Sequence, residues 1–195
     1  LAPFADTRVF GVLQRIALCY GIASLMIRYL KPRASLYLSI FFLLFYWFVL
    51  YAFGGNDPLG MQGNVGYKID AWLLGDAHLY HGEGVAFDPE GLLSTLPAIA
   101  NVVAGFHVGK FLQEKGMTYE SLAKLLMTGA LLLFLAWCWN LSFPINKKLW
   151  TSSFVLHTVG LDCIILSIII YVIECRKQTR WTYFFLVFGR NPLFI

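Results

Sequence analysis

The sequence predicts an all-α protein, a polytopic bundle of transmembrane helices. Of its 195 residues, 58% are apolar and only 13% carry a charge, and the mean hydropathy is +0.66. A soluble domain has about 45–50% apolar and about 25% charged residues. Backbone amides in hydrocarbon must bond internally, and long apolar runs without strict alternation exclude a closed β-barrel. The composition also excludes a disordered tail, a nucleic-acid-binding arm and a disulfide-stapled secreted domain.

Five apolar segments are long enough to cross a bilayer, which takes about 20 helical residues. These spans cover about 9–29, 35–53, 91–112, 122–141 and 151–173, and an incomplete sixth begins near residue 181. We interpret residues 1–195 as one transmembrane domain with a long loop at 54–90. Because the chain starts with Leu1 and stops inside an apolar run, we expect it to be a piece of a longer membrane protein.

The distribution of Lys and Arg predicts the orientation. Nine of these residues lie in the loops around 28–33, 110–124 and 176–180, whereas the other connections and the N-terminal segment hold four. Basic loops face the cytoplasm. The 54–90 loop and the 142–150 loop are therefore expected on the extracytoplasmic side.

The 54–90 loop combines acidic, aromatic and histidine side chains. Its apolar residues argue for order, with a short helix near 67–74. His78 and His81 lie three residues apart, but no third or fourth ligand is evident, so we expect no metal site. The cysteines have no CxxC spacing and are expected to pack as small apolar residues.

An arginine inside the first span is the strongest sign of a polar site. Arg15 lies about 10 Å below the start of that helix, where it is costly unless it faces protein or water. Arg8 lies seven residues earlier on the same face, and Gln14 adjoins Arg15. The pattern indicates either a polar cavity open to the outside or a structurally paired arginine.

The third span opens with a helix-start signature. Asp88 fits an N-cap, Pro89 the first helical position and Glu90 the first turn. Glu90 is a candidate to hold a cationic group as well. Further along, Asn101, Gly105 and Gly109 follow at intervals of four, a spacing typical of close helix packing.

The connection before the fifth span carries cations on an otherwise acidic side. Asn146, Lys147 and Trp150 fit either interfacial anchoring or a cationic lid over an anionic substrate. Within that span, His157 and Asp162 are expensive in a membrane and mark either a site or helix pairing.

Four segments in a fixed order carry a family resemblance. They are RVFGVLQRIALCY at 8–20, FDPEGLLSTLPAI at 87–99, FPINKKLWTSSF at 143–154 and GRNP at 189–192. The set resembles the heparan-α-glucosaminide N-acetyltransferase family, particularly its bacterial members. The resemblance implies transfer of acetyl from cytosolic acetyl-CoA to the amine of an extracytoplasmic glucosamine, in a bacterial inner membrane. It also implies a catalytic histidine N-terminal to Leu1, so no catalytic residue is assigned in this chain.

On this basis we expect two sets of site residues. The candidate substrate-binding residues are Arg8, Gln14, Arg15, Asp88, Glu90, Asn146, Lys147, Trp150 and His157. The candidate residues for coenzyme A, whose phosphates call for cations, are Arg176, Lys177, Arg180, Arg190 and Asn191.

The remaining expectations concern partners and alternative functions. Expected partners are the lipid bilayer and an amino sugar, with no nucleic acid and no metal; a homodimer is one option for assembly. Alternative functions are an O-acyltransferase of a cell-surface glycan, a sugar transporter and a purely structural membrane subunit. Transporters often show paired repeats with broken helices, and none is visible here.

Overall fold

The computed structural model describes residues 7–82 and 84–190, which form helices and loops without a strand. The helices are α1 (Val12–Tyr29), α2 (Pro32–Phe53), α3 (Val65–Leu74), α4 (Thr95–Lys115), α5 (Tyr119–Asn140), α6 (Ser152–Ile170) and α7 (Thr182–Arg190). A short 3₁₀ turn, η1 (Asp76–His78), follows α3, and a π-helical turn, η2 (Tyr171–Cys175), extends α6. The predicted all-α fold class is confirmed.

Four helices are long and apolar enough to cross a membrane: α2, α4, α5 and α6 with η2. The 18-residue α1, which contains Arg15 and Arg28, is not among these four. Large apolar side chains are exposed along the outer faces of the helices, for example Leu13, Phe48 and Phe134. An apolar outer surface is what a lipid-facing helix requires.

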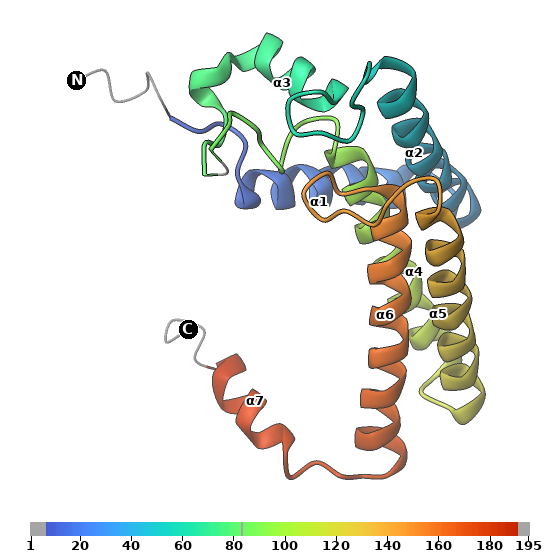
Figure 1. Ribbon diagram of the computed structural model, residues 1–195. Helices are drawn as coiled ribbons and strands as arrows, with labels where there is room; N and C mark the ends of the chain where they lie inside the picture. Colours follow the sequence, from blue (N-terminus) through green and yellow to red (C-terminus); the bar gives the residue numbers. More distant parts are fainter. Residues whose placement is uncertain (1–6, 83, 191–195) are drawn as a thin grey trace.

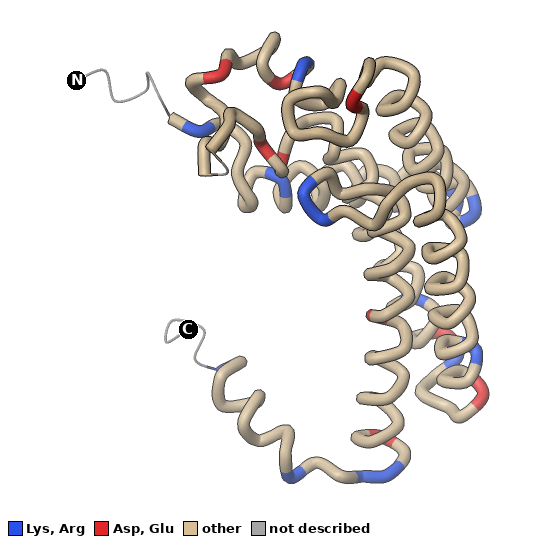
Figure 2. The backbone as a smooth tube through the Cα atoms, in the orientation of Figure 1, with Lys and Arg blue, Asp and Glu red and all other residues tan. Residues whose placement is uncertain are grey.

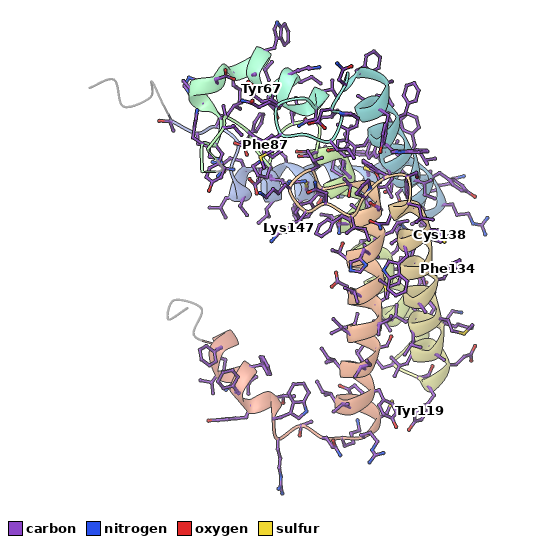
Figure 3. All side chains as sticks on the ribbon, viewed as in Figure 1. Tyr67, Phe87, Tyr119, Phe134, Cys138 and Lys147 are labelled. Atoms are coloured by element: carbon purple, nitrogen blue, oxygen red, sulfur yellow. The ribbon has the colours of Figure 1, made fainter. Side chains whose placement is uncertain are left out.

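Two ends of the bundle differ in character. We call the end formed by residues 54–94 and 141–151 the loop end, and the end formed by residues 116–118 and 176–181 the basic end (Figure 1). Lys, Arg, Asp and Glu gather at these ends, and long stretches of the helices between them carry none (Figure 2). Figure 3 places Tyr67, Phe87 and Lys147 at the loop end and Tyr119 at the basic end.

The start of α4 corrects one sequence prediction. The helix begins at Thr95 rather than near residue 91, so Asp88 is not its N-cap. Asp88 accepts a hydrogen bond from the amide of Glu90 at 3.1 Å, closing a tight turn, and its carboxylate also binds Arg8. The hydroxyls of Ser94 and Thr95 both donate to the carbonyl of Gly91. These contacts hold residues 88–94 as a folded turn above the helix.

Helices α5 and α6 lie side by side and make the most extensive contact between helices of the described residues (Figure 1). Their backbones approach where Gly129 meets Gly160. A Cβ atom added to Gly129 would lie 2.7 Å from the carbonyl oxygen of Gly160, and one added to Gly160 would lie 2.9 Å from that of Gly129. Neither position has room for a side chain, which is how small residues let membrane helices approach closely.

Helix α1 buries one narrow face against α4. Its buried residues recur every three or four positions, which keeps them on one side of a helix. They are Arg15, Cys19, Ala23 and Met26. The apolar members pack with Ala98, Ile99 and Val103 of α4. This seam fixes the position of Arg15.

We predict that Gly129→Val separates α5 from α6. The added side chain meets backbone atoms that cannot move aside, and overpacking of this kind costs about 1–3 kcal/mol. Thermal unfolding of the detergent-solubilised protein measures the loss. Gly21→Ala is the control, because the space around Gly21 is open and alanine favours a helix. Equal stabilities of the two variants would contradict the close contact.

Candidate functional site

Arg15 is the centre of a polar site near the loop end. Only 7% of the residue is exposed. Its guanidinium donates to the carbonyl oxygen of Pro89 at 2.9 Å and to that of Ser94 at 2.7 Å. Its Nε has no hydrogen-bond partner among the described residues, and none of their carboxylates lies within ion-pair distance. A buried cation is therefore held by main-chain dipoles.

Trp150 supports the same guanidinium from the other side. The Arg15 Cζ lies 4.2 Å from the centre of the indole ring, a cation–π contact. The indole Nε1 donates to Asn101 Oδ1 at 3.3 Å, and Asn101 Nδ2 donates to Thr158 Oγ1 at 3.2 Å. Trp150 has a φ of 52°, in the left-handed region that bulky residues rarely adopt. Its surroundings hold this strained backbone in place.

The loop before α6 is shaped by its own polar side chains. Asn146 Oδ1 accepts from the amide of Lys148 at 2.9 Å. Thr151 Oγ1 accepts from the amide of Asn146 at 3.0 Å and donates to the carbonyl of Pro144 at 2.9 Å. Thr151 also caps α6 by accepting from the amide of Phe154. Asn146 therefore contributes to the loop that presents Trp150.

A second cluster joins the segment before α1 to the turn before α4. Arg8 binds Asp88 through two hydrogen bonds, at 2.7 and 3.0 Å, and Glu90 at 2.5 Å. Its guanidinium also lies 4.6 Å from the ring centre of Tyr80. The carboxylates raise the pKa of Arg8 further above its ordinary value, chiefly through the hydrogen bonds that Arg8 donates to Asp88. Asp88 and Glu90 are therefore already occupied by a cation of the same chain.

Asp70 is a buried carboxyl group that the sequence analysis did not single out. It lies on α3, is 2% exposed and accepts from the amide of Leu92 at 3.0 Å. Burial raises its pKa from 3.8 to about 6; the Leu92 amide opposes the rise and the charge of Asp88 adds to it. No local signal in the sequence distinguishes Asp70 from the other acidic residues of the 54–90 loop.

A narrow cavity lies between these groups, lined by Tyr46, Asp70, Asp88, Ser94 and Lys148 among others. The volume open to the centre of a water molecule is about 10 Å³, room for roughly one water. The expected polar cavity beneath the 54–90 loop is thus small in this structure. Asn64, which caps α3 through a bond from the Tyr67 amide at 2.8 Å, forms another wall.

The other expected substrate-binding residues are less closely connected. Gln14 and Lys147 are exposed, whereas Arg15 is buried. His157 is partly buried on α6, and its Nδ1 has no partner in the described part of the chain. The structure thus brings together Arg15 and Trp150, and separately Arg8, Asp88 and Glu90.

The expected coenzyme residues lie at the basic end. Arg176, Lys177 and Arg180 are exposed in the connection before α7, and Lys177 pairs with Glu174 at 3.3 Å. Arg190 is the last residue of α7, and Asn191 lies outside the described residues.

The loop histidines bind main-chain oxygens rather than one another. His78 Nδ1 lies 2.9 Å from the carbonyl of Thr7, and His81 Nδ1 lies 2.8 Å from that of Leu79. In the ranges 7–82 and 84–190, no group of three or more His, Cys, Asp or Glu is arranged to hold a metal ion.

Comparison with known proteins identifies the family. The heparan-alpha-glucosaminide N-acetyltransferase of Mus musculus is 33% identical over 165 aligned positions that cover 72% of this chain. That of Homo sapiens is 32% identical over the same share. The chain belongs to this family. The alignments cover 24% and 23% of the two relatives, so the chain corresponds to about a quarter of their length. No family model matches the chain.

We predict that Arg8→Gln and Asp88→Asn each destabilise this family member by about 1–3 kcal/mol, because each leaves a charged partner without its hydrogen bonds. The double variant should lose less than the sum of the two, since the pair is lost only once. Thermal unfolding in detergent measures the coupling. Lys124→Gln is the control, because it breaks an exposed pair with Glu120 and should change stability little. Additive losses would contradict the pairing.

We predict that Asp70 makes the stability of the protein fall as pH rises. The fold raises the pKa of this carboxyl from 3.8 to about 6, so folding favours the protonated form. Its stabilising contribution is complete below the unfolded value and is lost as pH rises through the folded value. Asp70→Asn keeps an oxygen for the Leu92 amide and does not titrate. Unfolding temperatures measured from about pH 4 to about pH 7 should therefore decline less in this variant.

Asp76→Asn is the control for this experiment, because Asp76 is an exposed carboxylate of the same loop region. If Asp70→Asn and the unmodified protein show parallel pH profiles, the buried carboxyl does not titrate as the structure indicates.

Proposed function

We propose that this chain forms part of an enzyme that transfers acetyl from acetyl-CoA to the amino group of a glucosamine-type sugar. One observation carries the proposal: the segments 8–20, 87–99 and 143–154, far apart in the sequence, meet at one side chain. Arg15 comes from the first, its carbonyl partners at Pro89 and Ser94 from the second, and Trp150 from the third. The names of the two relatives agree with this activity.

The reaction determines what the site must provide. The free amine attacks the carbonyl carbon of the thioester, a C–N bond forms, the C–S bond breaks, and the thiolate leaves as coenzyme A. Negative charge develops on the acyl oxygen, and the sugar ammonium must first lose a proton. A positive group held in a water-poor site stabilises that oxygen most effectively. We assign this role to Arg15, with Trp150 as the residue that positions it.

The acceptor is proposed to bind at the loop end, on the extracytoplasmic side. Four further residues on the elements around Arg15 are proposed to contact the sugar. They are Gln14, Asn146, Lys147 and His157. The hydrogen bonds of Arg8 already pair it with Asp88 and Glu90. We therefore assign these three residues a structural role: they stabilise the turn that carries the Pro89 and Ser94 carbonyls.

The donor is proposed to enter from the basic end, on the cytoplasmic side. The exposed cations Arg176, Lys177 and Arg180 suit the phosphates of coenzyme A. The excess of Lys and Arg at this end supports the orientation, and a bacterial inner membrane is the proposed location. The base that deprotonates the ammonium is not assigned to His78 or His81, because both face main-chain oxygens.

The test uses the full-length protein in detergent or proteoliposomes, with labelled acetyl-CoA and glucosamine or its oligomers. We expect an amide product. Arg15→Gln should lower kcat/KM by about 10²-fold or more, the typical effect of removing a group that stabilises the oxyanion. Arg15→Lys should recover part of the loss, because it restores the charge but not the two-pronged binding of Pro89 and Ser94.

Lys124→Gln is the matched control and should retain activity, because Lys124 is exposed and pairs with Glu120, far from Arg15 in the fold. An ester product would indicate O-acyl transfer instead, and sugar uptake without acetylation would indicate a transporter. Folded full-length protein that forms no acetylated product would overturn the proposal.

A further inference from the structure

A groove lies between α4 and α6, and it begins beside Asn101, the residue that accepts the hydrogen bond of the Trp150 indole. Its volume is about 260 Å³. The α4 wall contains Asn101, Gly105 and Gly109, and the α6 wall contains Asp162 and Cys163. The space beside both glycines is open, because a Cβ atom added to either would meet nothing within 4 Å. The groove therefore has room for a closely packed neighbour.

Asp162 places an exposed carboxylate near the middle of an apolar segment that is long enough to cross a membrane. It is the eleventh residue of the 24-residue segment Ser152–Cys175, so it lies about 15 Å from the loop end. The hydrocarbon layer is about 30 Å thick, which puts Asp162 near its midplane. No Lys, Arg or His of the described ranges lies within 4.0 Å of the carboxylate. A carboxylate facing lipid at this depth is costly, and a covering group that carries a positive charge would stabilise this face.

Helix α7 is the neighbour that the chain connectivity favours. Only residues 176–181 separate it from η2, and helices joined by short connections pack as antiparallel neighbours. In the structure α7 runs back from the basic end but stands apart from α6 (Figure 1). None of its residues is buried, and it exposes the apolar side chains of Phe184, Phe185 and Leu186.

Arg190 gives α7 the complementary charge. It is the ninth residue of the helix and lies about 12 Å along it, within the hydrocarbon layer if α7 starts at the membrane surface. No hydrogen bond or ion pair joins Arg190 to another described residue. Asp162 lies about 20 Å from the basic end. The two residues therefore differ in depth by about 8 Å, a distance that the flexible arginine side chain and the aspartate together can span.

We propose that α7 packs into the groove between α4 and α6 and that Arg190 pairs with Asp162 inside the membrane. The glycines of α4 let α7 approach, and the ion pair removes two unpaired charges from the lipid. This assignment takes Arg190 out of the set of coenzyme-binding cations. It does not depend on the proposed acetyl transfer, because its test measures packing.

The first test is a charge exchange in the full-length protein. Asp162→Arg and Arg190→Asp each place like charges together and should lower the unfolding temperature by several degrees. The double variant D162R/R190D restores an opposite pair and should recover most of the loss. The matched control D162R/R180D moves the acidic residue to the connection at the basic end and should not recover.

The second test is cross-linking in the native membrane. Ile169 lies seven residues after Asp162 on the same face of α6, and Leu186 lies four residues before Arg190 on α7. With the four native cysteines replaced, I169C/L186C should form a disulfide on mild oxidation, whereas L131C/L186C, with Leu131 on the outer face of α5, should not.

Recovery in the charge exchange together with the α6–α7 cross-link establishes the packing. Absence of the cross-link in folded protein overturns the proposal. So does a D162R/R190D variant no more stable than the single variants. Lys110 of α4, which pairs with Glu114 at 3.7 Å, is the rival partner. If exchange with Lys110 instead of Arg190 restores stability, the assignment is wrong.

Discussion

The structure depends on the way one buried cation is satisfied. Arg15 enters the apolar part of the bundle on α1, and two carbonyl oxygens of the segment before α4 receive its hydrogen bonds. The Pro89 carbonyl also accepts from the hydroxyl of Ser94 at 3.1 Å, within the turn that residues 88–94 form ahead of α4. The turn is held by Arg8 from outside and by Asp70 from α3. The segment before α1, the 54–90 loop and α4 are thereby connected through a few polar contacts.

Much of the fold follows from the sequence because the physical rule is simple. Hydrocarbon forces backbone amides to bond internally, so each long apolar run becomes a helix, and the predicted runs all contain one. The short helix in the loop was also predicted, because Tyr67 and Leu74 delimit an apolar, helix-compatible stretch. Local signals misplaced the start of α4. Asp88 has the composition of an N-cap, but its carboxylate binds Arg8, 80 residues earlier in the chain.

The site was predictable in part. An arginine within an apolar helix is expensive anywhere, so Arg15 stood out from the sequence alone. Its partners did not, because they are main-chain oxygens, and every residue has one. Asp70 and Asn101 were missed as site residues for a related reason: their importance comes from what folds against them. Trp150 was predicted as an interfacial anchor or lid, but no local signal indicates that its backbone adopts a left-handed conformation.

The glycine contact between α5 and α6 has a mechanical consequence. Because the two backbones are in direct contact, neither helix can rotate or slide without a steric clash. Helices α5 and α6 therefore form one rigid unit. Trp150 lies just before α6 and is therefore fixed to this rigid unit. Arg15 lies on α1, whose buried residues pack against α4. If a bulky molecule is to reach Arg15, we therefore expect α1 to move, while the Trp150 indole keeps its position relative to α6.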